Sequence, residues 1–154
     1  MRLNRDRTTL KMYLGDTGLL ISHAFDENGL VSEEVYKKLL LGKLEVNEGM
    51  LFENIVAQML TATGRRLYFY SNSSRTDKES RMEIDFLIAK KPATGRHNIS
   101  PIEVKSGENY TLSSLKKCMR KYAEQLSTPY VIHTADYAEK DGIVYLPVYM
   151  VWLL

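Results

Sequence analysis

The spacing of apolar residues changes at Gly64, and this change constrains the fold more than any other feature of the chain. Upstream of Gly64, apolar residues from Met50 to Leu60 recur at steps of three and four, which predicts an amphipathic helix over residues 47–64. Downstream, apolar residues alternate at a period of two, as strands do. We therefore expect an α/β structure in which helices cover a sheet.

Several short segments after Gly64 have strand patterns. The polar loop at residues 90–98 contains Pro92 and Gly95, so the run at 99–105 should return antiparallel to the strand before it. A second amphipathic helix, at 111–127, permits a parallel crossover to the following strand. The predicted fold is a mixed β-sheet flanked by helices. The strand segments are residues 67–70, 83–89, 99–105 and 130–133, with further terminal strand material at 143–146 and 148–154.

Length and composition limit what the chain can be. At 154 residues it has room for one domain, with an N-terminal helical and turn segment at 1–46, including a helix over 33–41 capped by Ser32, and a core at 47–154. The single cysteine, Cys118, excludes an internal disulfide and a zinc site. We find no membrane-length apolar run and no secretory signal pattern, so we expect no membrane partner and a cytoplasmic location.

Two acidic clusters stand where neighbouring strands are predicted: Glu83-Ile84-Asp85 and Glu103-Val104-Lys105. Strict alternation along 83–89 places Ile84, Phe86 and Ile88 on one face and Glu83, Asp85 and Leu87 on the other. Glu103 and Lys105 share a face of their strand, and the hairpin brings Asp85 alongside them. Carboxylates gathered in this way need a balancing cation.

A hard divalent cation such as Mg²⁺ is the natural balance, because it is held by one or two carboxylates together with water and substrate phosphate. In such a site Lys105 would orient water or stabilise negative charge developing on phosphorus. Glu53, at the edge of the apolar stripe of the 47–64 helix, could complete the outer coordination. The predicted reaction is hydrolysis of a phosphodiester.

These residues resemble a known pattern. Asp85 followed by Glu103-Val104-Lys105, with Glu53 on a preceding helix, looks like the PD-(D/E)XK nuclease superfamily, which has a mixed sheet flanked by helices. The narrower resemblance is to a C-terminal domain of unknown function that follows an AAA+ ATPase module in many bacterial and archaeal proteins. The segments that carry this narrower resemblance are Tyr13-Leu14-Gly15-Asp16-Thr17-Gly18-Leu19, Gly49-Met50-Leu51-Phe52-Glu53-Asn54, Glu83-Ile84-Asp85-Phe86 and Pro101-Ile102-Glu103-Val104-Lys105-Ser106-Gly107.

The resemblance implies a role for each matching residue. Asp85 and Glu103 correspond to the acidic ligands of Mg²⁺ or Mn²⁺, and the backbone carbonyl of Val104 faces the metal in related nucleases. Lys105 corresponds to the lysine of the motif, and Glu53 to the helix glutamate. Together they imply a metal-dependent nuclease that acts on DNA.

The chain departs from the pattern in two places. Ile84 stands where the motif has proline, a loss that leaves the chemistry intact, and no glycine-rich phosphate loop occurs anywhere in the chain. We therefore expect the ATPase module to be absent from this chain and to precede it in the longer family members.

Weaker features and a second function stay open. Basic residues outnumber acidic ones only after Gly64, and four of them are weak candidates for nucleic-acid contacts. A solvated basic face is the more frequent meaning of such a pattern. The alternative function is a non-catalytic DNA- or protein-binding regulatory domain on the same fold. The four weak candidates are Arg75 and Arg81, before Asp85, and Lys116 and Lys117, on the outer face of the second helix with Arg120 and Lys121.

Overall fold

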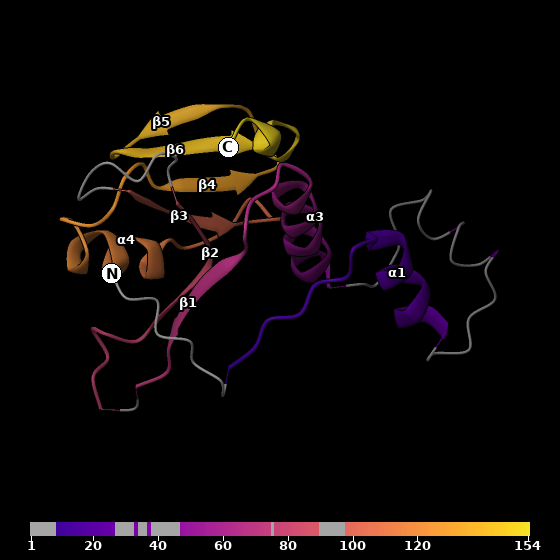
Figure 1. The fold of residues 1–154 in the computed structure, drawn as a ribbon, viewed down its shortest axis with the longest axis horizontal. Helices are drawn as coiled ribbons and strands as arrows, with labels where there is room; N and C mark the ends of the chain where they lie inside the picture. The colour runs from indigo at the N-terminus through magenta and orange to yellow at the C-terminus, as the bar shows by residue number, and fades with distance from the viewer. Residues whose placement is uncertain (1–8, 27–32, 34–36, 38–46, 75, 90–97) are drawn as a thin grey trace.

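The fold is a mixed six-stranded sheet with helices on both faces, as the change in hydrophobic period predicts (Figure 1). The computed structural model describes residues 9–26, 33, 37, 47–74, 76–89 and 98–154. The expected 33–41 helix and the loop at 90–98 lie almost entirely outside these ranges. The elements are α1 (Thr17–Asp26), α3 (Glu48–Ala62), β1 (Tyr68–Asn72), β2 (Met82–Ala89), β3 (Ile99–Val104), α4 (Ser113–Lys121), β4 (Tyr130–His133), β5 (Ala138–Lys140), β6 (Ile143–Pro147) and the 3-10 helix η1 (Val148–Leu153).

The strands lie in the order β1-β2-β3-β4-β6-β5. Strands β2 and β3 pair antiparallel, with Phe86 opposite Ile102, and β3 and β4 pair parallel, with Glu103 opposite Val131. The predicted hairpin and the predicted parallel crossover through α4 are both confirmed. The candidate residues of β2 and β3 therefore lie on adjacent strands near the middle of the sheet.

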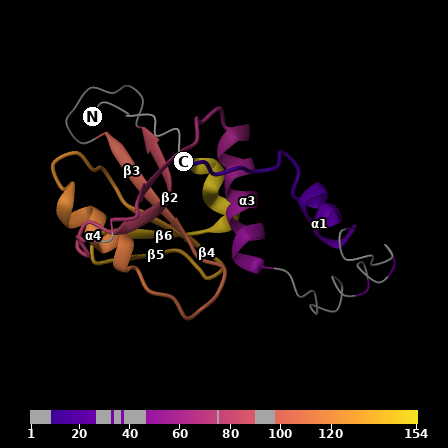
Figure 2. The same ribbon diagram turned by 90° about the horizontal axis from the view of Figure 1, so that it is seen from below.

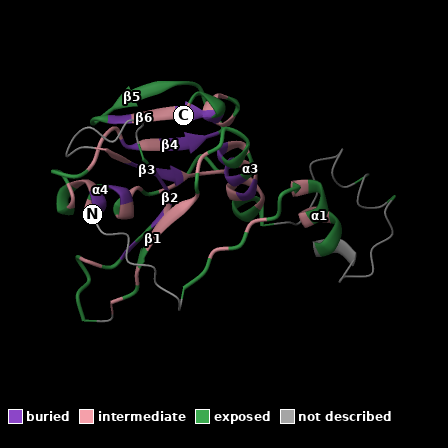
Figure 3. Cartoon of the chain, viewed as in Figure 1, coloured by how far each residue is buried: buried purple, intermediate pink, exposed green. Residues whose placement is uncertain are grey.

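Helices α3 and α4 cover opposite faces of the sheet, and each covers its own hydrophobic cluster (Figures 2 and 3). The α3 cluster includes Leu60, Phe86 and Ile102, whereas the α4 cluster includes Leu115 and Val131. Neighbouring strand residues thus point into different clusters, as the pleat of a sheet requires. Burial on both faces makes these central strands apolar except where they carry the candidate site.

Helix α3 begins and ends where the sequence indicates. The side chain of Asn47 accepts a hydrogen bond from the backbone N–H of Met50, which satisfies one of the free amides of the first turn. At the other end Gly64 has a φ of +76°, a conformation that glycine adopts without steric cost. Both ends are thus fixed by local chemistry.

The structure differs from expectation in three places: one helix is shorter, one terminal run is not a strand, and one strand is additional. Helix α4 ends at Lys121 instead of reaching Ser127, because the chain turns there and the N–H of Gln125 bonds the carbonyl of Tyr122. The run Val148–Leu153 is a 3-10 helix and not a strand, and β5 was not expected at all. Thr17 and Gly18 belong to α1, whose first turn is capped by the Asp16 side chain through the N–H of Leu19.

The predicted alternation along β2 is also wrong, because β2 contains a bulge. Tyr68 pairs with Leu87 but Tyr70 pairs with Ile84, so three steps on β2 oppose two steps on β1. Ile84 consequently packs in the α4 cluster together with Leu87, while Phe86 packs in the α3 cluster. The bulge spans Asp85, a residue that the sequence singles out.

In the described part of the chain, no helix is both long enough and apolar enough to cross a membrane.

Candidate functional site

The segment that precedes α1, residues 9–16, crosses the end of α3, and we call it the strap. Asn54 of α3 anchors it, because its side chain accepts from the N–H of Leu14 at 2.9 Å and donates to the carbonyl of Leu14 at 3.1 Å. The same amide donates to the hydroxyl of Thr17 at 2.9 Å. Asn54 is 2% exposed, so these bonds satisfy a polar side chain that would otherwise be buried alone.

Lys11 of the strap lies among three carboxylates. Its ammonium nitrogen is 2.9 Å from Glu53 of α3, 2.9 Å from Glu83 and 3.4 Å from Asp85. Burial by itself would lower the pKa of Lys11, but its hydrogen bonds to Glu53 and Glu83, together with the negative charges of Asp85 and Glu53, hold the pKa above the ordinary lysine value. Lys11 is therefore charged and neutralises part of the acidic cluster.

Tyr13 follows Lys11 by two residues and points the same way. Its hydroxyl donates to Glu53 Oε1 at 2.5 Å, and its ring packs on Phe86 with the centroids 5.4 Å apart. Burial and the hydrogen bond to Glu53 raise the pKa of the Tyr13 hydroxyl, so it stays protonated and remains a donor. Lys11 and Tyr13 together hold one oxygen of Glu53 in a fixed place.

Asp85 lies on the bulge of β2, and both of its carboxylate oxygens have partners. Oδ2 accepts from the backbone N–H of Val104 at 2.8 Å, and Oδ1 lies near Lys11. Burial raises the pKa of Asp85, and the charge of Glu53 adds to this effect; the N–H of Val104 and the lysines only partly offset it. The bulge turns this carboxylate toward the α3 side, where the strap can reach it.

Glu103 is the most deeply buried acid of the site, with a side chain 8% exposed. Its Oε1 accepts from Lys105 at 3.0 Å, whereas its Oε2 is buried and has no hydrogen-bond partner within the described residues. Burial raises the pKa of Glu103, and the negative charge of Asp85 raises it further. A buried carboxylate oxygen without a partner is costly, so this atom is a candidate ligand for a cation.

Val104 connects the charged side chains around Asp85 with the ion pair of Glu103 and Lys105. This residue stands between Glu103 and Lys105, and its N–H is the group that binds Asp85. The structure thus brings Glu53 and Asp85 together through Lys11, brings Glu103 and Lys105 together directly, and joins the two groups through the end of β3. The metal-facing role of the Val104 carbonyl stays a prediction.

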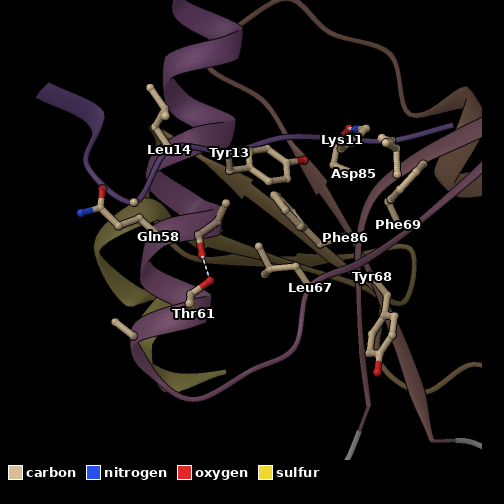
Figure 4. A pocket seen from close by; sticks show the side chains of 14 residues that line it. Lys11, Tyr13, Leu14, Gln58, Thr61, Leu67, Tyr68, Phe69, Asp85 and Phe86 are labelled. Atoms are coloured by element: carbon tan, nitrogen blue, oxygen red, sulfur yellow. Dashed lines mark hydrogen bonds and ion pairs between the residues drawn. The ribbon is translucent and has the colours of Figure 1, made fainter. Parts of the chain in front are cut away.

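A groove of about 660 Å³ lies beside the strap, and the carboxylate of Asp85 stands at its rim (Figure 4). Aromatic rings line much of it, from the strap and from β1 and β2, with polar groups of α3 along one wall. The residues labelled in Figure 4 are Lys11, Tyr13, Leu14, Gln58, Thr61, Leu67, Tyr68, Phe69, Asp85 and Phe86. Asp85 is the acid of the site that lines this groove, so a ligand in the groove would approach the site at Asp85.

The basic residues singled out as weak nucleic-acid contacts lie elsewhere. Lys117 donates to the backbone carbonyls of Lys78 and Arg81, at 2.6 and 3.5 Å, so it helps to hold the turn before β2. Lys116 is exposed on α4, and Arg81 is exposed beside β2. Arg75 lies outside the described residues. None of the described members of this set contacts the acidic site.

The metal-binding capacity of the site must rest on few protein ligands. Within the described ranges, no group of three or more His, Cys, Asp and Glu side chains is arranged to hold a metal ion. Mg²⁺ does not require such a group, because it keeps several waters and is often bound by one or two carboxylates. The expectation that Asp85 and Glu103 hold the ion involves two carboxylates, and within the described residues the buried Oε2 of Glu103 has no hydrogen-bond partner.

Sequence reasoning gave no role in the site to Lys11, Tyr13 or Asn54, and it named Glu83 only as a neighbour of Asp85 in the acidic cluster. The spacing of Lys11 and Tyr13 was a usable signal, because residues two apart share a face of an extended segment. Nothing in the sequence, however, showed that an extended segment 40 residues upstream of α3 would cross its end. The contacts of Lys11 with Glu53 and Asp85 span 42 and 74 positions.

The comparisons with known proteins place this domain in a family. A family model described as a domain of unknown function, DUF4143, matches residues 48–151, which covers α3 and the entire sheet. The searches of curated proteins and of solved structures found no match. Because the family model spans well over half of the sequence, the chain belongs to the DUF4143 family of domains of unknown function.

Proposed function

We propose that this chain is a Mg²⁺-dependent, nuclease-like domain of the PD-(D/E)XK type that hydrolyses DNA phosphodiesters. The supporting layout is an acid on a bulged strand, a Glu-Val-Lys sequence at the end of the next strand, and a glutamate on the preceding helix. We propose further that it works beside an AAA+ ATPase module, on the resemblance of its motifs. A restriction-endonuclease-like core is part of the same proposal.

The observation that carries the proposal is the hydrogen bonding of the two carboxylate oxygens of Glu103. One of its oxygens is held by Lys105, and the other is buried without a hydrogen-bond partner in the described part of the chain. Leaving a buried carboxylate oxygen unpaired costs free energy that a bound cation would recover. The donor set therefore fits a hard divalent ion held by Glu103 and Asp85.

The residues around the ion have separable tasks. When bound, Mg²⁺ polarises a phosphoryl oxygen and lowers the pKa of a coordinated water. Lys105 keeps a positive charge beside Glu103, where it can orient the attacking water or stabilise the charge that develops on phosphorus. Glu53, fixed through Oε1 by Tyr13 and Lys11, presents its carboxylate from the helix edge toward the same region.

The test is cleavage of supercoiled plasmid and labelled oligonucleotides in Mg²⁺ or Mn²⁺. Wild type should cleave, and Lys105→Ala should lose about 100-fold in rate, as the removal of a group that stabilises transition-state charge typically does. Lys140→Ala is the matched control, because Lys140 is exposed on the edge strand β5 and should leave the rate unchanged. An inactive wild type, or equal rates for wild type and Lys105→Ala, rejects catalysis at this site.

A second function has one observation in its favour. Lys11 gives Glu53 and Asp85 a positive partner from the chain itself, which would suit a domain that binds a partner and cleaves nothing. A regulatory domain of this kind would bind DNA or a partner protein equally well in EDTA and in Mg²⁺. A filter-binding titration in both buffers separates this function from the nuclease, for which cleavage requires the cation.

A further inference from the structure

The strongest feature outside the proposed chemistry is Lys11, a cation supplied by the chain itself. Its ammonium contacts three carboxylates, and its side chain is only 18% exposed. Two of the three, Glu53 and Asp85, are residues that the proposed metal site uses. The positive charge of Lys11 therefore occupies part of the space in which a divalent cation would be stabilised.

The partners of Asp85 show at which oxygen Lys11 and a divalent cation would compete. Its Oδ2 is engaged by the N–H of Val104, a backbone group that cannot leave without breaking the end of β3. The remaining oxygen, Oδ1, is the one near Lys11, and at 3.4 Å this contact is the longest of the three. Oδ1 is the carboxylate oxygen that accepts no backbone hydrogen bond, so a cation that binds Asp85 through Oδ1 meets the ammonium of Lys11 at the same atom.

The Lys11 side chain can move away from Asp85 Oδ1 while the rest of the strap stays bound to α3. Asn54 binds Leu14 and Thr17 whatever Lys11 does, so the strap stays anchored three residues away. Glu83, whose side chain is 56% exposed, offers the ammonium an alternative partner at the solvent side. A small movement of one side chain would release Asp85 while the ion pair with Glu83 is kept.

We propose that Lys11 is a built-in counter-ion that competes with a divalent cation for Asp85, so that the strap and the metal bind the acidic site in opposition. This inference rests on the proposed function, because it assumes that Asp85 and Glu103 hold the cation. Coupling of this kind is reciprocal: whatever Lys11 costs the metal in affinity, the metal costs the Lys11 contact. Lys11 thus lowers the affinity of the acidic site for a divalent cation.

The test measures Mn²⁺ affinity by isothermal titration calorimetry, without reference to cleavage. Lys11→Met removes the charge and keeps the apolar stem, and it should bind Mn²⁺ about tenfold more tightly than wild type, within the range of typical coupling between sites. Lys11→Arg keeps the charge and should bind like wild type. In parallel, Mn²⁺ should raise the melting temperature more in Lys11→Met than in wild type.

Thr17→Val is the matched control for a loosened strap, because it removes the hydrogen bonds of the Thr17 hydroxyl with Asn54 and Gln58 and leaves Lys11 and Glu53 in place. It should bind Mn²⁺ like wild type, whereas a gain equal to that of Lys11→Met would overturn charge competition. Equal affinities for wild type and Lys11→Met overturn this inference alone. If neither protein binds Mn²⁺ and the ion changes the melting temperature of neither, the metal site itself is refuted.

Discussion

Asp85 and Glu103 lie on adjacent strands and have similar environments in one respect: burial raises the pKa of both. They differ in their partners. Both oxygens of Asp85 are engaged, one by the backbone of β3 and one by Lys11 of the strap. Among the described residues, Glu103 has a hydrogen-bond partner for one oxygen, and this partner is Lys105, two residues along the same chain segment.

The difference shows that two carboxylates in one site can receive their positive partners from different parts of the fold. The partner of Glu103 is local and follows from strand geometry, since residues two apart share a face. Lys11 reaches Asp85 from 74 positions away, and only the tertiary fold brings it there. The Glu103 half is therefore built into β3, whereas the Asp85 half depends on the strap. The following predictions test that division.

The largest effect on stability should come from removing Lys105. In Lys105→Met, Glu103 keeps its burial and loses the counter-charge to which it is hydrogen-bonded, and breaking a buried pair in this way costs about 3 kcal/mol of unfolding free energy. Urea denaturation in EDTA measures the loss. Adding Glu103→Gln to Lys105→Met should restore most of the stability, and a loss below about 1 kcal/mol in the single variant would contradict the prediction.

A smaller effect, confined to the other half, should follow from Asn54→Ala. The variant removes the three hydrogen bonds that anchor the strap, which we expect to cost about 2 kcal/mol because the backbone groups of Leu14 lose their partners. Trypsin should then cut after Lys11 faster than in wild type. Lys105→Met, compared under conditions where both proteins stay folded, should not change that rate, and a similar acceleration there would show that the halves are not separate.

The smallest effect concerns Cys118 of α4, on the face away from the strap. Burial, with a further contribution from the charge of Glu103, raises the pKa of the thiol to about 11. The thiolate is the reactive form, so iodoacetamide should label the folded protein slowly at pH 9 and the urea-unfolded chain readily. Because Cys118 is the only cysteine, mass spectrometry reads the reaction directly.

Glu103→Gln removes one of the two causes and should lower the pKa of Cys118 slightly, moving the onset of labelling to lower pH. Asp85→Asn should leave it unchanged, since Asp85 does not contribute to the shift. Equal responses to the two substitutions would contradict the assignment of this pKa shift to Glu103 and not to Asp85.

Local pattern was sufficient for much of the fold. The cap at Asn47, the end at Gly64 and the antiparallel hairpin of β2 and β3 all follow from residues close in sequence. The neighbouring positions of Asp85 and Glu103 follow from that hairpin. Local pattern failed at the bulge, because the extra residue of β2 is seen only against its partner strand β1.

The sequence by itself determined which chemical groups are present and which share a strand: Glu103 with Lys105, and Asp85 on the strand before them. Only the tertiary structure decided which way Asp85 turns and which cation it meets. The physical reason is the separation in sequence over which each kind of interaction acts. Helix caps and strand alternation act over a few residues, whereas the contact of Lys11 with Asp85 exists because packing of the strap on α3 closes a loop of 74 positions.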